Sequence, residues 1–379
     1  MEVIVNWERV KFVFDTLIAA WEKKDFPYNL PKAKPPQDEN MPKTLERGGL
    51  REALKYFYDC LYMRQDMSDT GMGLLSRLYD DHSWLFYPPA MLKLKAEEVE
   101  EYLKQYGRAF HAKENARYWV ENTRRLVEHW GGDPRNIYAS GDYWEICKKV
   151  GRETKGYEDI GFFGFKRKMT SMLAYYLVQA GLIPDGEYAI PVDIQVCKTV
   201  FGHEFFTFIG DWPNGHLGHE WLFDLVRCIS LQYLKSTGKS FVALSNALWI
   251  FARTLCKRYP GNRTRRGGGK GRNIILIPEP IDSRSWTHAK TRSVDRSCRI
   301  CPIRSTCVYE VPQAENKHHG RIITRRKRIT PPQGDLIFDL GLELDPRRWD
   351  FPNKQNGNQS DGTSDIAEEL SQLFIAFDP

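Results

Sequence analysis

No run of about 18 consecutive apolar residues, the length that a membrane-spanning helix needs, occurs in the sequence. The opening residues, "MEVIVNWERVKFVFDTLIAAWEKKD", mix charged and apolar side chains too closely for a secretory signal peptide. We therefore expect a cytoplasmic protein without a membrane partner. In that reducing compartment the eight cysteines do not predict a disulfide framework, and clustered thiols are better interpreted as metal or cluster ligands.

Strand patterns are scarce as well, and the best candidates are residues 273–278 and 336–344. Apolar residues at helical spacing dominate and predict four long helices, at residues 94–106, 113–130, about 216–236 and 242–256. On the second of these helices the spacing predicts a buried face of Ala116, Val120, Thr123 and Val127. With 41% hydrophobic residues, the chain has enough apolar material for a sizeable and mainly helical core.

Acidic residues are missing from residues 257–272, "KRYPGNRTRRGGGKGR", which include Arg263, Arg265 and Arg266. The net charge of the whole chain is only +6, so the positive charge is concentrated in a few stretches. Such a basic loop fits a polyanionic partner, because binding a phosphate backbone releases its counterions. A solvated loop without a partner is the alternative.

The cysteines fall into two groups. The stretch "RSCRICPIRSTCVY" (residues 296–309) places three of them close together in a basic context, and these are Cys298, Cys301 and Cys307. Four others lie on helical or apolar stretches, where we expect small core residues, and these are Cys60, Cys147, Cys197 and Cys228.

Two further stretches carry candidate chemistry. In "GFFGFKRKMTSMLAYYLVQAG" (residues 161–181), a glycine-containing turn opens a helix that Gly181 closes. Backbone amides at such a helix start can bind phosphate, although most such turns are only structural. Beyond this helix, "AIPVDIQVCKTVFG" places Asp193 in an apolar context, where the carboxylate could also serve as a helix N-cap.

In their order along the chain, these features resemble the endonuclease III-like helix-hairpin-helix (HhH-GPD) superfamily of DNA glycosylases. "GFKRK" resembles the hairpin turn of that family, and "PVDIQV" resembles the segment with its catalytic aspartate. "LYMRQDMSD" and "FHAKENARYWVENTRRLVEHWGG" are similar to segments before the hairpin, and "ALWIFARTLC" is similar to the helix that ends in the first cluster cysteine. One departure is Lys166, which stands where the family usually has a second hairpin glycine.

The resemblance implies roles for individual residues. Lys168 would attack the anomeric carbon as an amine, and Asp193 would stabilise the charge that develops during base release. Lys168 could instead be only a phosphate contact. The implied DNA contacts, which include the residue that fills the gap left by a flipped-out base, are Arg64, Gln65, Gly164, Lys166 and Arg167. The basic run separately predicts phosphate contacts by Arg263, Arg265 and Arg266.

The resemblance further implies a [4Fe-4S] cluster held by four thiolates, those of Cys256, Cys298, Cys301 and Cys307. Residues 257–297 separate the first two of these ligands, whereas the family has a short loop there. Such a loop can still close, because closure entropy grows only logarithmically with length. Tetrahedral zinc is the alternative for four thiolates.

The expected fold is all-α and two-lobed, with an iron-sulfur cluster loop and a small C-terminal extension. The expected parts are an N-terminal helix and loop (1–54) joining the cluster lobe, a six-helix barrel lobe with the helix-hairpin-helix (55–195), the cluster lobe (196–310) with a basic insertion (257–297), and an extension (311–379). The extension is predicted to contain a flexible linker and an acidic amphipathic helix that could bind a protein partner.

The function that the resemblance implies is a nucleoid-associated DNA repair glycosylase with AP lyase activity. Its partner would be double-stranded DNA with a damaged or mismatched base. A monofunctional glycosylase is one alternative. A catalytically inert DNA-binding protein with a structural cluster is the other.

Overall fold

The structure is a computed structural model, which describes residues 2–31, 33–63, 68–106, 111–151, 156–209, 217–255, 273–278, 300–307, 320–325 and 374–376. The chain forms two compact units. Unit 1 consists of residues Met1–Ala33, Val192–Thr237 and Asn246–Pro379, and unit 2 consists of Lys34–Pro191 and Gly238–Ser245. Residues 34–54 thus belong to unit 2, whereas the sequence placed them with the N-terminal segment.

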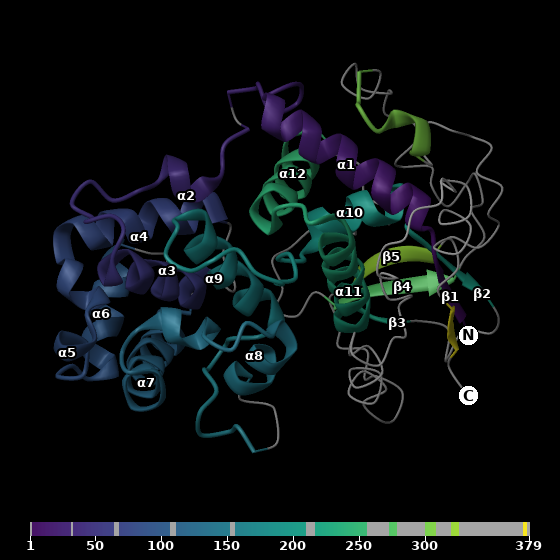
Figure 1. The fold of residues 1–379 in the computed structure, drawn as a ribbon. Coiled ribbons are helices and arrows are strands. Elements are labelled where there is room, and N and C mark those ends of the chain that lie inside the picture. The colour runs from purple at the N-terminus through teal and green to yellow at the C-terminus, as the bar shows by residue number, and fades with distance from the viewer. Residues whose placement is uncertain are drawn as a thin grey trace, which may run out of the picture. The chain divides into compact units, whose positions relative to one another are not determined.

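The named elements of unit 2 among its described residues are all helices (Figure 1). Its α-helices are α2 (Pro36–Glu39), α3 (Leu50–Met63), α4 (Ser68–His82), α5 (Pro88–Met91), α6 (Ala96–Tyr106), α7 (Ala112–Trp130), α8 (Tyr143–Val150) and α9 (Arg167–Gln179). Two 3-10 helices, η1 (Ser83–Phe86) and η2 (Pro134–Tyr138), join them. The predicted helices at 94–106 and 113–130 are confirmed as α6 and α7.

Helix α3 is the centre of unit 2, because every residue from Glu52 to Met63 is buried. It packs against α4, α7 and α9. Aromatic rings fill the space around it: Tyr58 stacks on Trp119 of α7 with ring centroids 4.7 Å apart, and Phe57 stacks on Phe165 at 5.5 Å. A helix that is buried on all sides fixes the position of the elements packed on it.

The buried face of α7 differs from the predicted one. Ala116 and Thr123 are 0% exposed, as predicted, but Val127 is 38% exposed. Trp119 and Asn122, which the prediction omitted, are 1% and 0% exposed and extend the buried face to one side. The helix is therefore rotated so that polar side chains as well as apolar ones face the interior.

Unit 1 contains α1 (Trp7–Lys23), α10 (Ile194–Gly202), α11 (His219–Thr237) and most of α12 (Phe241–Thr254), whose first residues belong to unit 2. Helices α11 and α12 confirm the predictions for 216–236 and 242–256. Phe14 of α1 packs edge-on against Tyr233 of α11 and against Phe205, with centroids 4.9 and 5.2 Å apart. These rings join α1 to the later part of the chain.

Two small antiparallel sheets, which the sequence indicated only at residues 273–278, accompany the helices of unit 1. The first has the order β2-β1-β6, and the second has the order β3-β4-β5. The strands are β1 (Glu2–Val5), β2 (Phe206–Ile209), β3 (Leu217–Gly218), β4 (Asn273–Pro278), β5 (Gly320–Arg325) and β6 (Phe374–Ala376). The framework remains all-α, as predicted.

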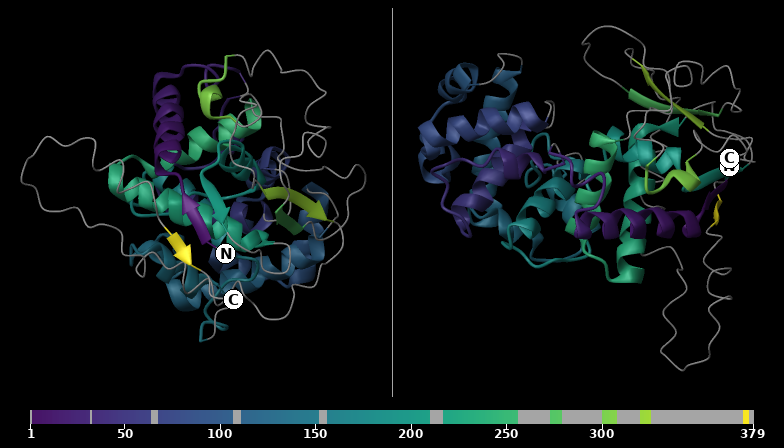
Figure 2. Two further views of the ribbon diagram at one scale, coloured as in Figure 1. Left: turned by 90° about the vertical axis from the view of Figure 1, so that its right-hand side faces the viewer. Right: turned by 90° about the horizontal axis from the view of Figure 1, so that it is seen from above.

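Strand β6 corrects the prediction of a C-terminal helix at residues 374–376. Phe374, Ile375 and Ala376 pair with the N-terminal strand β1, beside which β6 is drawn in yellow in Figure 2. An edge strand offers unpaired backbone groups to any extended segment, and this pairing competes with helix formation. The rest of the predicted helix, the linker at 352–363 and the candidate strand at 336–344 lie outside the described residues.

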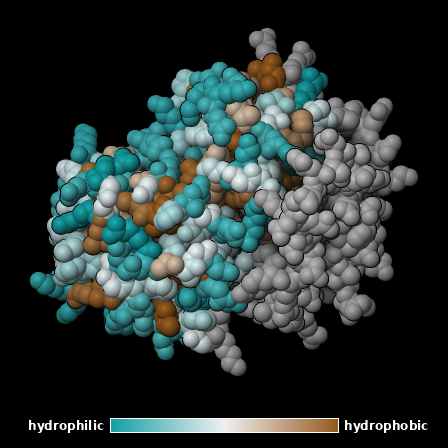
Figure 3. All heavy atoms as spheres, in the orientation of Figure 1, coloured by the Kyte–Doolittle hydropathy of each residue, from teal (hydrophilic) through white to brown (hydrophobic). Residues whose placement is uncertain are grey.

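Large hydrophobic side chains that are clearly exposed lie on separate segments, among them Phe12, Leu30 and Leu92. On the face drawn in Figure 3, hydrophilic side chains separate the hydrophobic ones into small areas. None of the helices in the described ranges combines the length and the apolar character that a membrane crossing requires.

Candidate functional site

The start of α9 brings four of the predicted site residues together in unit 2. Lys166 is the N-cap residue, and its side chain makes no capping hydrogen bond. Arg167 and Lys168 follow in the first turn, which contains no acidic residue. Because a helix start carries partial positive charge, each cation there is unfavourable by about 0.3–1 kcal/mol.

Two other helices of unit 2 begin with acidic side chains, which the partial positive charge of a helix start favours. Helix α6 has Glu97 and Glu98 in its first turn. The side chain of Asp142 caps α8 and accepts a hydrogen bond from the backbone of Glu145. The three consecutive cations at the start of α9 thus differ from the starts of α6 and α8, and a bound anion would offset their repulsion.

Gly164 shapes the turn before α9. Its φ is +74°, a left-handed conformation that glycine adopts without the steric cost of a Cβ atom. None of the residues that the structure describes accepts a hydrogen bond from its backbone N–H. The amide of Gly164 is therefore a donor without a protein acceptor in the described chain.

The three cations have different surroundings. Lys166 is exposed, whereas Arg167 and Lys168 are half-buried. The guanidinium of Arg167 lies 5.6 Å from the ring centroid of Trp144 on α8. Arg167 thus stacks on an indole in the structure, so the groups best placed to meet an anion are the exposed Lys166 and the backbone amides.

Lys168 lies next to the central helix α3. Burial raises the pKa of the Cys60 thiol well above its ordinary value, and the carboxylate of Asp59 adds to this rise. The ammonium of Lys168 opposes it, as does that of Lys55. The half-buried Lys168 is thus near enough to the Cys60 thiol to influence its pKa.

Asp193 lies in unit 1 and opens α10. Its Oδ1 accepts hydrogen bonds from the backbone amides of Gln195 (2.8 Å) and Val196 (3.2 Å). The N-cap interpretation is therefore confirmed. The side chain is half-buried, and its second oxygen, Oδ2, accepts no hydrogen bond from the described residues. Capping thus fixes the carboxylate while leaving one oxygen for other interactions.

Two of the four predicted cluster ligands lie in the described segment 300–307. Cys301 and Cys307 flank the 3-10 helix η4 (Arg304–Thr306) and are half-buried. The buried His203, which directly follows α10, fixes this turn through a 2.8 Å contact between its Nδ1 and Oγ1 of Thr306. Two thiols on one turn are compatible with a site in which several cysteines bind a metal ion or cluster.

Several predicted residues cannot be placed against this geometry. Cys256 and Cys298, Arg64 and Gln65, and the basic residues Arg263, Arg265 and Arg266 lie outside the described residues. Among the residues that are described, no group of three or more histidine, cysteine or acidic side chains could hold a metal ion. The other four cysteines, Cys60, Cys147, Cys197 and Cys228, are buried as predicted.

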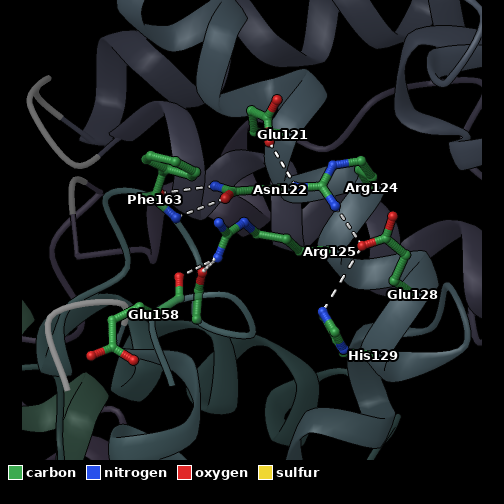
Figure 4. Close-up of polar contacts among 9 residues, drawn as sticks. Glu121, Asn122, Arg124, Arg125, Glu128, His129, Glu158 and Phe163 are labelled. Carbon is green, nitrogen blue, oxygen red and sulfur yellow. Dashed lines mark hydrogen bonds and ion pairs between the residues drawn. The ribbon is translucent and has the colours of Figure 1, made fainter. Parts of the chain in front are cut away.

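Two functional candidates on α7 did not follow from the sequence. Asn122 donates from Nδ2 to the Phe163 carbonyl (2.9 Å) and accepts at Oδ1 from the Phe163 amide (2.7 Å), as Figure 4 shows. Arg125 donates from Nη1 to the carbonyls of Glu158 (2.9 Å) and Gly161. The only sequence signal was polar residues three apart beside an apolar stripe, which is typical of many solvated helix faces.

Among known proteins, this chain is similar only to solved structures. No protein-family model and no curated protein matches the chain. The chain is similar to a thermostable thymine-DNA glycosylase at 14% identity and a TM-score of 0.42, covering 80% of this chain and 97% of that one. It is also similar to endonuclease III, in a trapped covalent intermediate with DNA, at 15% identity and a TM-score of 0.41, covering 66% and 88%.

Proposed function

We propose that this protein is a DNA repair glycosylase that flips a damaged or mismatched base out of the duplex and excises it. We propose further that it is bifunctional and cleaves the strand as an AP lyase through Lys168. The observation that carries this proposal is the start of α9, where an uncapped helix presents three cations and a Gly164 amide without an acceptor among the described residues. Such a start suits a DNA phosphate.

Lys168 is the proposed nucleophile. Its neutral amine would attack the anomeric carbon, and the glycosidic bond would break with its electron pair leaving on the base, which takes up a proton. The attacking amine would lose a proton, and the sugar ring would open as the C1′–O4′ bond breaks with its electron pair going to O4′, which takes up a proton and leaves an iminium at C1′. Loss of a C2′ proton would then expel the 3′ phosphate. A half-buried side chain at the start of α9 supports this role, because partial burial restricts the conformations of the lysine side chain.

Asp193 is the proposed electrostatic residue. Departure of the base creates positive charge on the sugar, and a fixed carboxylate stabilises that charge without having to reorganise. The two amides that hold Oδ1 supply the fixation, and Oδ2 is the oxygen that would face the charge.

The proposed partner is double-stranded DNA. We propose that Arg64 or Gln65 fills the gap left by the flipped base and that Arg263, Arg265 and Arg266 bind phosphates. Neutralising these three arginines together should lower the slope of log K against log salt by about two to three units for undamaged duplex. An unchanged slope would mean that the basic loop is only a solvated connector.

We also propose that Cys256, Cys298, Cys301 and Cys307 hold a [4Fe-4S] cluster. The support is the chemistry of four thiols together with the turn that carries two of them, which contacts His203, the residue after α10. When bound, the cluster would cross-link segments that are distant in sequence and would take no part in the chemistry of Lys168 or Asp193.

A panel of duplexes, each with one lesion or mismatch, tests the glycosylase proposal. Under single-turnover conditions the protein should release one class of base and leave undamaged duplex intact. A monofunctional enzyme would release the base without cutting the strand. Tight binding of duplex with no base release from any substrate would favour the catalytically inert DNA-binding protein.

A further inference from the structure

Two buried polar side chains of α7 form hydrogen bonds to the backbone of the turn that precedes α9. Asn122 is 0% exposed and Arg125 is 5% exposed. Burying an amide and a guanidinium costs several kcal/mol that apolar side chains would not cost. Both side chains hydrogen-bond to the backbone of residues 158–163, as the dashed lines in Figure 4 show. These hydrogen bonds hold the turn in one defined conformation.

The hydrogen bonds of α7 also set the direction of the Gly164 amide. In a trans peptide the carbonyl and the following N–H point in opposite directions. Because the carbonyl of Phe163 points to Asn122, the N–H of Gly164 points away from α7. The neighbouring peptide behaves in the same way: the Gly161 carbonyl faces Arg125, and the Phe162 N–H donates to the carbonyl of Val150 instead.

The ring of Phe163 adds a second constraint. The guanidinium of Arg125 lies 4.8 Å from its centroid, and the ring of Tyr118 stacks on it at 5.3 Å with an interplanar angle of 27°. The residue immediately before Gly164 is therefore fixed through its backbone and its side chain, both from α7.

We propose that Asn122 and Arg125 are positioning residues that aim the Gly164 N–H and the start of α9 at a phosphate of DNA. This inference rests on the proposed function and adds α7 to its site. Neither side chain contacts the DNA. Both act through the turn, so that its donors need no rearrangement when the anion arrives.

Adjacent arginines on α7 provide a matched test. Arg124 pairs with Glu121 (3.1 Å) and Glu128 (2.5 Å) on the exposed side of the helix, whereas Arg125 binds the turn (Figure 4). Arg124→Met and Arg125→Met each remove one positive charge from the same helix. Their binding to a duplex with a tetrahydrofuran abasic-site analogue is measured at several salt concentrations, after melting curves establish that both are folded.

Arg125→Met should bind the duplex about 10-fold more weakly than Arg124→Met, the effect of losing about 1.4 kcal/mol of preorganisation. The salt slopes of the two variants should be equal, because a buried positioning residue releases no counterions. Arg125→Lys should recover part of the affinity, since an ammonium can still donate to a carbonyl. A loss of stability is excluded by the melting curves, because binding is compared at a temperature at which each variant is fully folded.

Equal affinities of Arg125→Met and Arg124→Met would overturn the inference. A slope lower by about one unit in Arg125→Met would also overturn it, because Arg125 would then contact phosphate directly. If Arg125→Met does not fold, the charge-conserving pair Arg125→Lys and Arg124→Lys decides by the same comparison. A wild-type protein that does not bind the duplex would instead refute the proposed function, and this inference with it.

Discussion

The ion pair between Lys55 and Asp59 in α3 offers a strong test of how unit 2 is held together. The Lys55 ammonium lies 2.7 and 2.6 Å from the two carboxylate oxygens of Asp59, and the side chains are 2% and 0% exposed. Asp59→Asn keeps the shape of the side chain but leaves the ammonium without a counter-charge. Removing one partner of a buried pair costs about 3–5 kcal/mol, so we expect a loss of that size in the free energy of unfolding.

The double variant Lys55→Gln with Asp59→Asn should recover most of this loss. Burial raises the pKa of Asp59 above its ordinary value although the Lys55 ammonium opposes the rise, so desolvation outweighs the attraction and a neutral pair is tolerated. Glu100→Gln is the matched control, because Glu100 forms an i,i+4 pair with the half-exposed Lys104 at 3.0 Å. That variant should cost less than about 1 kcal/mol.

Urea unfolding of the four proteins, followed by tryptophan fluorescence, measures these differences. The reasoning is refuted if Asp59→Asn costs no more than Glu100→Gln. It is equally refuted if the double variant is as unstable as Asp59→Asn, since the uncompensated charge would then not be the cause.

Two further predictions concern unit 1. The purified protein should absorb at roughly 400 nm from a thiolate-bound iron-sulfur cluster, and metal analysis that returns zinc without iron would contradict this. Burial, reinforced by Arg9, lowers the pKa of His203 to about 3 from 6.5. The unfolded chain therefore binds a proton that the folded chain rejects, and stability should fall by up to about 1.4 kcal/mol per unit as the pH drops from 6.5 toward 3. His203→Gln should flatten this fall in urea titrations, and an unaltered pH dependence would exclude His203 as its source.

Local patterns in the sequence predicted the elements whose causes are local. Apolar spacing predicted α6, α7, α11 and α12, and the capping role of Asp193 followed from one carboxylate at the start of an apolar run. The glycine-containing turn before α9 was predicted from residues 161–181 alone. In each case the physical cause lies within a few residues of the feature.

Features that depend on distant segments were not predictable in the same way. Strand β1 exists because Phe206–Ile209 and Phe374–Ala376 pair with it, and nothing within residues 2–5 indicates those partners. The buried face of α7 was misplaced for a related reason. Apolar spacing selected Val127 for the buried face, but the helix buries Asn122 instead. The side chain of Asn122 donates a hydrogen bond to Phe163, which lies 41 positions later in the chain.

Borohydride trapping is the most direct test of the central claim that Lys168 is the nucleophile. On abasic or lesion-containing duplex, reduction should fix the Schiff base and join the wild-type protein covalently to DNA. Lys168→Gln should lose the trapped band and keep duplex binding, because Lys166 and the amides at the α9 start remain. Asp193→Asn should slow base release by about 100-fold while retaining the nucleophile. A band of full intensity from Lys168→Gln would contradict the account.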